Sequence, residues 1–493
     1  MLSILRRFDQ TRKRLFLFIW VSSVFFALWR FSRVTQTFFM KYTDDYGDFE
    51  PGWLILNSHK KDKSDFEWET ISFLLKTNYV HIIVYLVSFE CLRVSHISEK
   101  SLQYFQITFS VMYLFSQMGY LLTWILLIQP ITFIIVGALH SKLCIWICNL
   151  TFIGLSAVFK KINSDETFLK QYRINHYETY ISILILSWMN LRCTSYYLTT
   201  SKEDIRKFLA YCLYFPTMCT GPFLSFKHFD GMYCKKFEPI AIRIKNLILN
   251  ILRCLIWFTF GEICLHYIYV NATGFQPEFV KQFDMWTLCG YGYAMGQFFH
   301  LKYIVIYGLS TSIASFENIT TPSLPRCIGR IHLYSEMWKY FDPGLYDFLK
   351  MCIYIPLRRF HLNKFLSSLL CFSFIFIWHG IAQHIFIWVV ANFIGINLES
   401  LANIIYESCL KNTEIVKSLG STKLQILKNL LASPLLAASA VSNFYFFAGV
   451  DIGYIFLQSF LTETFFNKMV LLSILYCCCE VSISLRDMKA RSL

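Results

Sequence analysis

An acid and a histidine stand at nearly equal distances on either side of a basic turn, inside a strongly apolar part of the chain. Asp342 lies 18 residues before Phe360, at the centre of that turn, and His379 lies 19 residues after it. A histidine near neutrality can accept a proton from a reacting group, and a neighbouring carboxylate can orient it. This pair of residue types therefore suits general-base chemistry.

Two apolar helices would have to position the pair. Asp342 precedes Pro343, the usual arrangement at a helix start, and an apolar run continues to about Pro356. A second apolar run covers residues 365–378 and ends in the sequence WHG. Helices of about 14 residues rise roughly 21 Å each at 1.5 Å per residue. If they run antiparallel, both polar residues lie at the same end, most of a bilayer core away from the turn.

Each residue also has a plain structural interpretation. Helix capping alone would account for Asp342, and an isolated histidine in an apolar helix is more often a packing residue than a catalytic one. An ionised Asp at the bilayer centre costs about 2.5–3.5 kcal/mol on insertion scales, so such residues usually pair or serve function. The paired spacing favours chemistry for His379, with His384, His81 and His266 as the structural comparisons.

The bulk composition predicts an all-α polytopic membrane protein. The 493 residues are 55% hydrophobic and 16% charged, with a mean hydropathy of +0.45, whereas soluble proteins carry about 25% charged residues. Apolar runs begin near residues 15, 71, 104, 131, 178, 245, 284, 345, 365, 381, 425 and 453. We expect about ten crossings plus re-entrant pieces, in a bundle of ten to twelve helices.

The first span is expected over residues 15–29. It follows Arg12, Lys13 and Arg14, which favour a cytosolic N-terminus. A signal peptide has a similar basic start, but no small-residue cleavage site follows this run.

The rest of the chain is expected to form one membrane domain, residues 1–493, without a soluble module. Residues 41–69 are its longest polar stretch and predict an interfacial loop. Pro216 and the pair Gly221-Pro222 interrupt residues 203–232, which predicts a broken, re-entrant segment beside a cavity. Residues 203–400 would hold the catalytic core.

Charge and cysteine content exclude several functions. The net charge is +14, but the basic residues are scattered between apolar runs, so we expect no nucleic-acid partner. The 17 cysteines form no CxxC pair, and Asp342, His379 and His384 lack further ligands at metal-site spacing. No G-x-S-x-G, H-E-x-x-H or P-loop sequence is present.

An ordered set of motifs resembles the membrane-bound O-acyltransferase family, and within it the Hedgehog acyltransferase branch. The motifs are KKDKSDFEW (60–68), YFPTMCTGPFLSF (214–226), KYIVIYG (302–308), LPRC (324–327), MWKYFDPGLYDFL (337–349), YIP (354–356), WHG (378–380) and NFIGINLE (392–399). They occur in the family's order over most of the chain. The match is weakest for residues 90–200 and 400–493.

The resemblance implies an endoplasmic reticulum or Golgi membrane enzyme, whose ten to twelve transmembrane and re-entrant helices surround a tunnel through the membrane. It would move a long acyl group, typically palmitoyl, from acyl-CoA to the N-terminal cysteine amine of a secreted, Hedgehog-like signalling protein. His379 would be the general base, Asp342 would orient the imidazole or the amine, and Cys327 would give its thiolate to a haem iron. Relatives that esterify hydroxyls usually carry His or Asn where Asp342 stands, and an inactive relative lacks the histidine that this chain keeps.

The turn departs from the family pattern. The sequence YIPLRR lacks the Gly-Gly that commonly follows YIP, and the turn is about three residues shorter than in the nearest branch. Arg358 and Arg359 could contact the CoA phosphates, or could only mark the cytosolic side of the membrane. Arg192, Tyr211 and Lys302 are candidate groups for steadying an oxyanion.

Alternative functions stay open on the sequence. An enzyme of the same family could act on another protein or on a lipid. A polytopic transporter would also show a broken helix and buried charges, although the chain shows no two related halves. A catalytically silent membrane scaffold is the third alternative.

Overall fold

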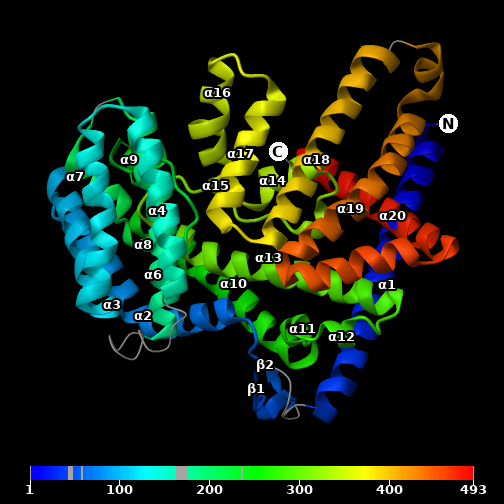
Figure 1. The fold of residues 1–493 in the computed structure, drawn as a ribbon, viewed down its shortest axis with the longest axis horizontal. Helices are drawn as coiled ribbons and strands as arrows, with labels where there is room; N and C mark the ends of the chain where they lie inside the picture. Colours follow the sequence, from blue (N-terminus) through cyan, green and yellow to red (C-terminus); the bar gives the residue numbers. More distant parts are fainter. Residues whose placement is uncertain are drawn as a thin grey trace.

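Helices make up almost all of the computed structural model, which describes residues 2–42, 48–56, 59–162, 175–201, 203–234, 237–411 and 413–491 (Figure 1). Eight of these described helices are long and apolar enough to cross a membrane. They are α1 (Leu2–Tyr42), α2 (Phe66–Val94), α3 (Glu99–Gly137), α4 (Lys142–Ile162), α10 (Ile240–Tyr267), α18 (Gln383–Ile405), α19 (Glu414–Thr462) and α20 (Phe465–Arg491). This confirms the predicted all-α membrane class, and the span predicted at 15–29 lies within α1.

The number of crossing helices differs from the expected ten because several expected runs are not separate spans. The runs near residues 425 and 453 both lie within α19, which is broken at Gly449. The runs expected near residues 104 and 131 belong to the single helix α3, which is broken at Gly119, where φ is +68°. The runs near 178 and 284 are α6 (His176–Thr199) and α13 (Met285–Phe316), which are buried mainly in protein. Hydropathy does not separate a helix that faces lipid from one that faces other helices.

Helix α13 lies across the middle of the molecule and supports the site. Figure 1 shows it below α17 and above the small elements at the lower end. It packs against α1, α10 and α19. Most of its residues are buried, including Lys302 and Tyr307.

The predicted broken segment at 203–232 is confirmed. It forms three short helices, α7 (Ile205–Cys212), α8 (Phe215–Met218) and α9 (Phe226–Cys234), separated near Pro216 and Pro222.

The part of residues 41–69 that the structure describes contains a two-stranded antiparallel sheet, while residues 43–47 and 57–58 lie outside the described residues. Strands β1 (Phe49–Glu50) and β2 (Lys61–Asp62) pair with each other, and η1 (Leu54–Leu56) lies between them. Both β2 side chains are buried against neighbouring segments. Lys61 pairs with Glu262 at 2.9 Å, and Asp62 accepts hydrogen bonds from the start of α11 (Val270–Gly274), which α12 (Pro277–Val280) follows.

The hairpin predicted around Phe360 is also present. After η2 (Ile328–Arg330) and α14 (Tyr334–Phe341), a continuous helical run consists of α15 (Pro343–Phe348), η3 (Leu349–Tyr354) and α16 (Ile355–Arg359). The chain then turns into α17 (Lys364–His379), which returns beside η3. The segment η4 (Tyr406–Leu410) later extends α18.

Candidate active site

Asp342 is held by two donors at the start of α15. The backbone N–H of Leu345 donates to Oδ1 at 2.9 Å, which is the predicted helix cap. The hydroxyl of Tyr307, on α13, donates to Oδ2 at 2.8 Å. The carboxylate is therefore fixed by its own helix and by a second helix that crosses below it.

His379 is the last residue of α17. Gly380 follows with a φ of +107°, a conformation that favours glycine, and its backbone N–H bonds back to Ile377. The imidazole ring lies edge-on to the rings of Trp388 and Phe446, with centroids 5.5 and 5.3 Å away. Helix termination and aromatic packing thus set the position of the ring.

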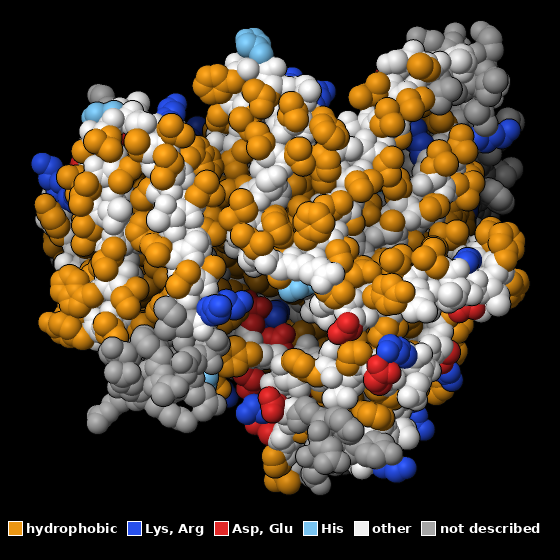
Figure 2. Space-filling view, in the orientation of Figure 1, with side chains coloured by type: hydrophobic (Ala, Val, Ile, Leu, Met, Phe, Trp, Pro, Cys, Tyr) orange, Lys and Arg blue, Asp and Glu red, His pale blue; other side chains and the backbone are white. Residues whose placement is uncertain are grey.

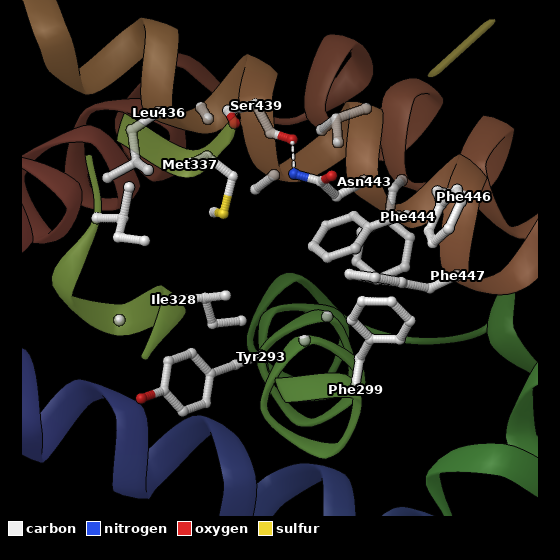
Figure 3. Close-up of a pocket in the computed structure, with 18 of the residues that line it drawn as sticks. Tyr293, Phe299, Ile328, Met337, Leu436, Ser439, Asn443, Phe444, Phe446 and Phe447 are labelled. Atoms are coloured by element: carbon white, nitrogen blue, oxygen red, sulfur yellow. Dashed lines mark hydrogen bonds between the residues drawn. The ribbon is translucent and has the colours of Figure 1, made fainter. Parts of the chain in front are cut away.

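Both side chains line one mainly hydrophobic space, which we call the apolar cavity and whose volume is about 380 Å³. It follows one face of α13, where lining residues recur at helical spacing: Cys289, Gly292, Gly296, Phe299, Tyr303 and Tyr307. Figure 3 shows Tyr293 and Phe299 of α13 on one side and Leu436, Ser439, Asn443, Phe444, Phe446 and Phe447 of α19 on the other. The wall from Cys289 to Tyr307 rises about 27 Å along the helix, so the space is long as well as apolar.

A second space, the polar cavity, has a volume of about 660 Å³. Seven residues line both cavities: Trp188, Phe299, Tyr303, Trp378, His379, Phe446 and Phe447. Asp342 lines only the apolar cavity. His379 therefore stands where the two cavities adjoin.

Charged side chains give the polar cavity its character. Lys302 pairs with Asp65 at 2.9 Å and with Glu67 at 2.7 Å. The side chain of Lys302 is 7% exposed, whereas the two carboxylates retain 17% and 20% exposure. Figure 2 shows acidic and basic side chains in the central hollow below the apolar upper part of the molecule. Lys160 also lines this cavity, so its two basic and two acidic side chains carry formal charges that balance.

The structure brings Asp342 and His379 to the same cavity, as their spacing predicts, but no hydrogen bond joins the two. Arg358 and Arg359 are exposed at the far end of the hairpin and line neither cavity. The 15 steps of α17 between Lys364 and His379 place that end about 22 Å from the imidazole.

The three candidate oxyanion groups have other partners. Arg192 is buried and donates to the carbonyl oxygen and the hydroxyl of Thr217, and Tyr211 bonds to the carbonyl oxygen of Leu224. Neither lines either cavity. Lys302 does line the polar cavity, within its ion pairs with Asp65 and Glu67.

Cys327, the haem ligand that the resemblance implies, stands next to Ile328 and Gly329, which line the apolar cavity. Its thiol lies 3.7 Å from Oε1 of Gln297. The role of Cys327 as a haem ligand stays a prediction, and the residue itself lines neither of the two cavities. Neither do the described residues hold a cluster of three or more His, Cys, Asp or Glu side chains suited to a metal ion.

Sequence reasoning missed Tyr307 and Trp188. Tyr307 stands in the KYIVIYG motif, but nothing in a single sequence connects it with an acid 35 residues later. Trp188 packs edge-on against Tyr307 and Trp378 from α6. It lies in the part of the chain where the motif resemblance is weakest.

Comparisons with known proteins place the chain among membrane-bound acyltransferases. Residues 128–426 match the sequence model described as "MBOAT, membrane-bound O-acyltransferase family". The chain is 32% identical over 377 residues to protein-cysteine N-palmitoyltransferase Rasp of Drosophila melanogaster, which covers 73% of each protein. It is 26% identical over 383 residues to protein-cysteine N-palmitoyltransferase HHAT of Mus musculus, covering 71% of this chain and 73% of that protein. The HHAT-like protein of Mus musculus is 22% identical over 363 residues.

Proposed function

Because this chain belongs to the membrane-bound O-acyltransferase family, we propose that it transfers a long acyl group, palmitoyl by preference, from acyl-CoA to the N-terminal cysteine amine of a secreted, Hedgehog-like protein. Rasp and HHAT, the relatives that match most of the chain, are both named protein-cysteine N-palmitoyltransferases. The single observation that carries the proposal is the position of His379. It borders an apolar cavity suited to a fatty chain and a polar cavity suited to a peptide end.

The reaction follows from the two environments. An α-amine has a pKa of about 7.7–8.0 in model peptides, so it is largely protonated at neutral pH. His379 accepts a proton from the amine, whose lone pair attacks the thioester carbonyl carbon. The carbon–sulfur bond then breaks, and the CoA thiolate takes up the proton that the nitrogen loses as the amide forms, so CoA leaves as a thiol. Asp342, 2.8 Å from the Tyr307 hydroxyl, orients the amine through its remaining lone pairs.

The two cavities suit the two substrates. The acyl chain occupies the apolar cavity along α13, where burial of each methylene contributes about 0.8 kcal/mol. The acceptor enters the polar cavity, where Asp65 and Glu67 attract its ammonium form. Lys302, which pairs with both carboxylates, and Lys160, which lines the same cavity, balance their negative charge, so the attraction depends on the greater exposure of the carboxylates.

The positions of the basic residues indicate which end of the protein faces the cytosol. Arg12, Lys13 and Arg14 precede the apolar part of α1, and Arg358 and Arg359 are at the hairpin tip. The N-terminus and the hairpin tip both lie towards the upper part of Figure 1, opposite β1 and β2. Basic flanks favour the cytosol. We therefore assign the hairpin tip to the cytosolic face of the endoplasmic reticulum, where Arg358 and Arg359 can contact CoA phosphates.

A reconstituted transfer assay tests the proposal. Purified protein in detergent is incubated with palmitoyl-CoA and a synthetic peptide that begins with cysteine. The expected product is a palmitoylated peptide that resists hydroxylamine, because an amide survives that treatment and a thioester does not. The same peptide with an acetylated N-terminus should yield no stable product.

Other outcomes would replace the proposal. Acylation of an added lipid, with no product on the peptide, would indicate a different acceptor within the same family. Absence of any acyl transfer by a protein that still binds an acyl-CoA analogue would indicate a silent scaffold. Release of bound palmitoyl-CoA unchanged on the other side of a vesicle would indicate a transporter.

A further inference from the structure

The hydroxyl of Tyr307 is the one side-chain donor that bonds Asp342 among the described residues. Its partner is Oδ2, at 2.8 Å, while the cap from Leu345 uses Oδ1 at 2.9 Å. Each carboxylate oxygen thus has one fixed donor. Because an ionised carboxylate offers about four acceptor positions, the remaining two can face the cavity.

Packing holds the Tyr307 ring where it is. The side chain is 3% exposed. Its ring lies edge-on to Trp188 with centroids 6.2 Å apart, and edge-on to Tyr303 with centroids 5.2 Å apart. A buried ring with two aromatic neighbours has little rotational freedom, so its hydroxyl is a rigid donor.

The neighbouring Tyr303 extends this support into the polar cavity. Its hydroxyl donates to Glu67 at 3.2 Å, and Glu67 also pairs with Lys302. One stretch of α13, residues 302–307, therefore contacts Asp342 on the apolar side and the charged wall of the polar cavity on the other.

We infer that Tyr307 is a positioning residue, which acts through Asp342 by fixing the carboxylate in the orientation that serves the acceptor amine. The inference rests on the proposed acyl transfer. Without the hydroxyl, Asp342 keeps the hydrogen bond from the Leu345 N–H, which caps the helix, but loses the one from Tyr307. The carboxylate can then rotate while its Oδ1 stays bonded to Leu345. Substrate binding does not depend on the hydrogen bond between Tyr307 and Asp342, whereas the orientation of the amine for attack does.

Replacing Tyr307 by Phe tests this role, because it removes one oxygen and keeps the ring. We expect kcat to fall roughly 10-fold, the effect of one hydrogen bond to a charged group. We also expect KM for palmitoyl-CoA and for the cysteine peptide to stay within about two-fold of wild type, as an interaction realised only in the transition state requires. Rates are expressed per mole of sites that bind a non-hydrolysable palmitoyl-CoA analogue, so partial misfolding does not imitate the result.

A double-mutant cycle distinguishes a Tyr307 that acts through Asp342 from a Tyr307 that acts on the substrate directly. If Tyr307 acts through Asp342, Tyr307→Phe should change the single-turnover rate of an Asp342→Ala protein by less than about two-fold. The matched control is Tyr454→Phe, which removes a hydroxyl from a tyrosine that is 56% exposed on α19. It should behave as wild type.

Two results would overturn the inference. One is an unchanged kcat in Tyr307→Phe, and the other is a 10-fold loss that recurs in full in the Asp342→Ala background. A wild-type protein that transfers no acyl group to the peptide would instead refute the proposed function. The wild-type rate therefore distinguishes the two failures.

Discussion

Asp342 and His379 line the same apolar cavity, and no hydrogen bond joins their side chains. His379 also lines the polar cavity, whereas Asp342 does not. We therefore expect the imidazole to meet the amine first and the carboxylate to act from the acyl side of the reacting atoms. Because the two groups do not depend on each other for their positions, each can be removed and its effect measured separately.

Replacing His379 by Ala should abolish acyl transfer while leaving the protein folded. Loss of a positioned general base costs typically 10²–10⁴-fold in rate. The residue ends α17, and Gly380 still terminates the helix, so we expect normal abundance. The measurement is the transfer rate to a cysteine peptide, normalised to the amount of protein that binds a palmitoyl-CoA analogue.

His384 provides the matched control for this change. It lies on α18, five residues beyond His379, and lines neither cavity. His384→Ala should keep at least half of the wild-type rate. Equal rates in His379→Ala and wild type would remove His379 from the mechanism.

Two replacements of Asp342 should separate its cap from its chemistry. Asn is as good a helix cap as Asp, whereas Ala is a poor one and costs about 1 kcal/mol. We expect Asp342→Asn to keep the wild-type melting temperature and Asp342→Ala to lower it. Both should lose at least 10-fold in kcat, because neither carries the charge. A fully active Asp342→Asn protein would show that the charge is not required, and a fully active Asp342→Ala protein would show that the residue is only a cap.

The hairpin of the site could be predicted from sequence because local rules determine it. Asp342 before Pro343 identifies a helix start, and the basic turn at Arg358 and Arg359 separates two runs of similar length. Helical rise then places Asp342 and His379 at one end. The broken segment at Pro216 follows from the same kind of rule, since proline interrupts a helix wherever it stands.

The remaining parts of the site depend on contacts that no local rule describes. Tyr307 reaches Asp342 from α13 and Trp188 reaches both cavities from α6, and each is only one aromatic residue among many in the chain. The spacing predicts that Asp342 and His379 share one end of the hairpin. It fixes their height along the helices but not the direction of each side chain, so it leaves open whether Asp342 orients the imidazole or the amine. Cys327 as a haem ligand rests on the motif resemblance alone and stays a prediction.

The length of the acyl chain should depend on Gly292. A Cβ atom at this position would lie 2.4 Å from Cζ of Phe444, and the Phe444 ring is itself packed against Phe456 with centroids 4.0 Å apart. Gly292→Ala therefore forces the Phe444 ring into the apolar cavity shown in Figure 3. We expect the rate with palmitoyl-CoA to fall several-fold relative to lauroyl-CoA, measured by competition between the two donors.

Gly154→Ala is the control for this prediction. Gly154 lies within α4, and a Cβ atom there would meet nothing within 4 Å. It makes the same chemical change in a helix without altering the cavity, so the preference between the two donors should not move. If Gly292→Ala also leaves the preference between palmitoyl-CoA and lauroyl-CoA unchanged, the end of the acyl chain does not lie beside Gly292.

Stability should depend on pH through Asp62, which lies in β2, outside the membrane-spanning helices. Burial raises the pKa of this carboxyl to about 6, although the backbone N–H groups of Ala272, Ser64 and Asn271 partly oppose the rise. The unfolded chain releases this proton near pH 3.8, the ordinary value. Between these values the folded state binds more protons, so stability falls as the pH rises through the window. The difference of about two pKa units corresponds to about 3 kcal/mol.

Asp62→Asn isolates this contribution, because the amide does not titrate. We expect the melting temperature of wild type, relative to the variant, to decrease steadily from pH 4 to pH 6 and then to level off. Thermal melts of the detergent-solubilised proteins at four pH values measure this difference in melting temperature. Subtracting the melting temperature of the variant removes the contribution of the other carboxylates that titrate in the same range. Since Asp62 holds the first N–H groups of α11, and Asn271 of that helix lines the polar cavity, its ionisation acts on the wall of the site. A constant difference across the range would mean that Asp62 is ionised in the folded protein throughout, with its three N–H donors outweighing its burial.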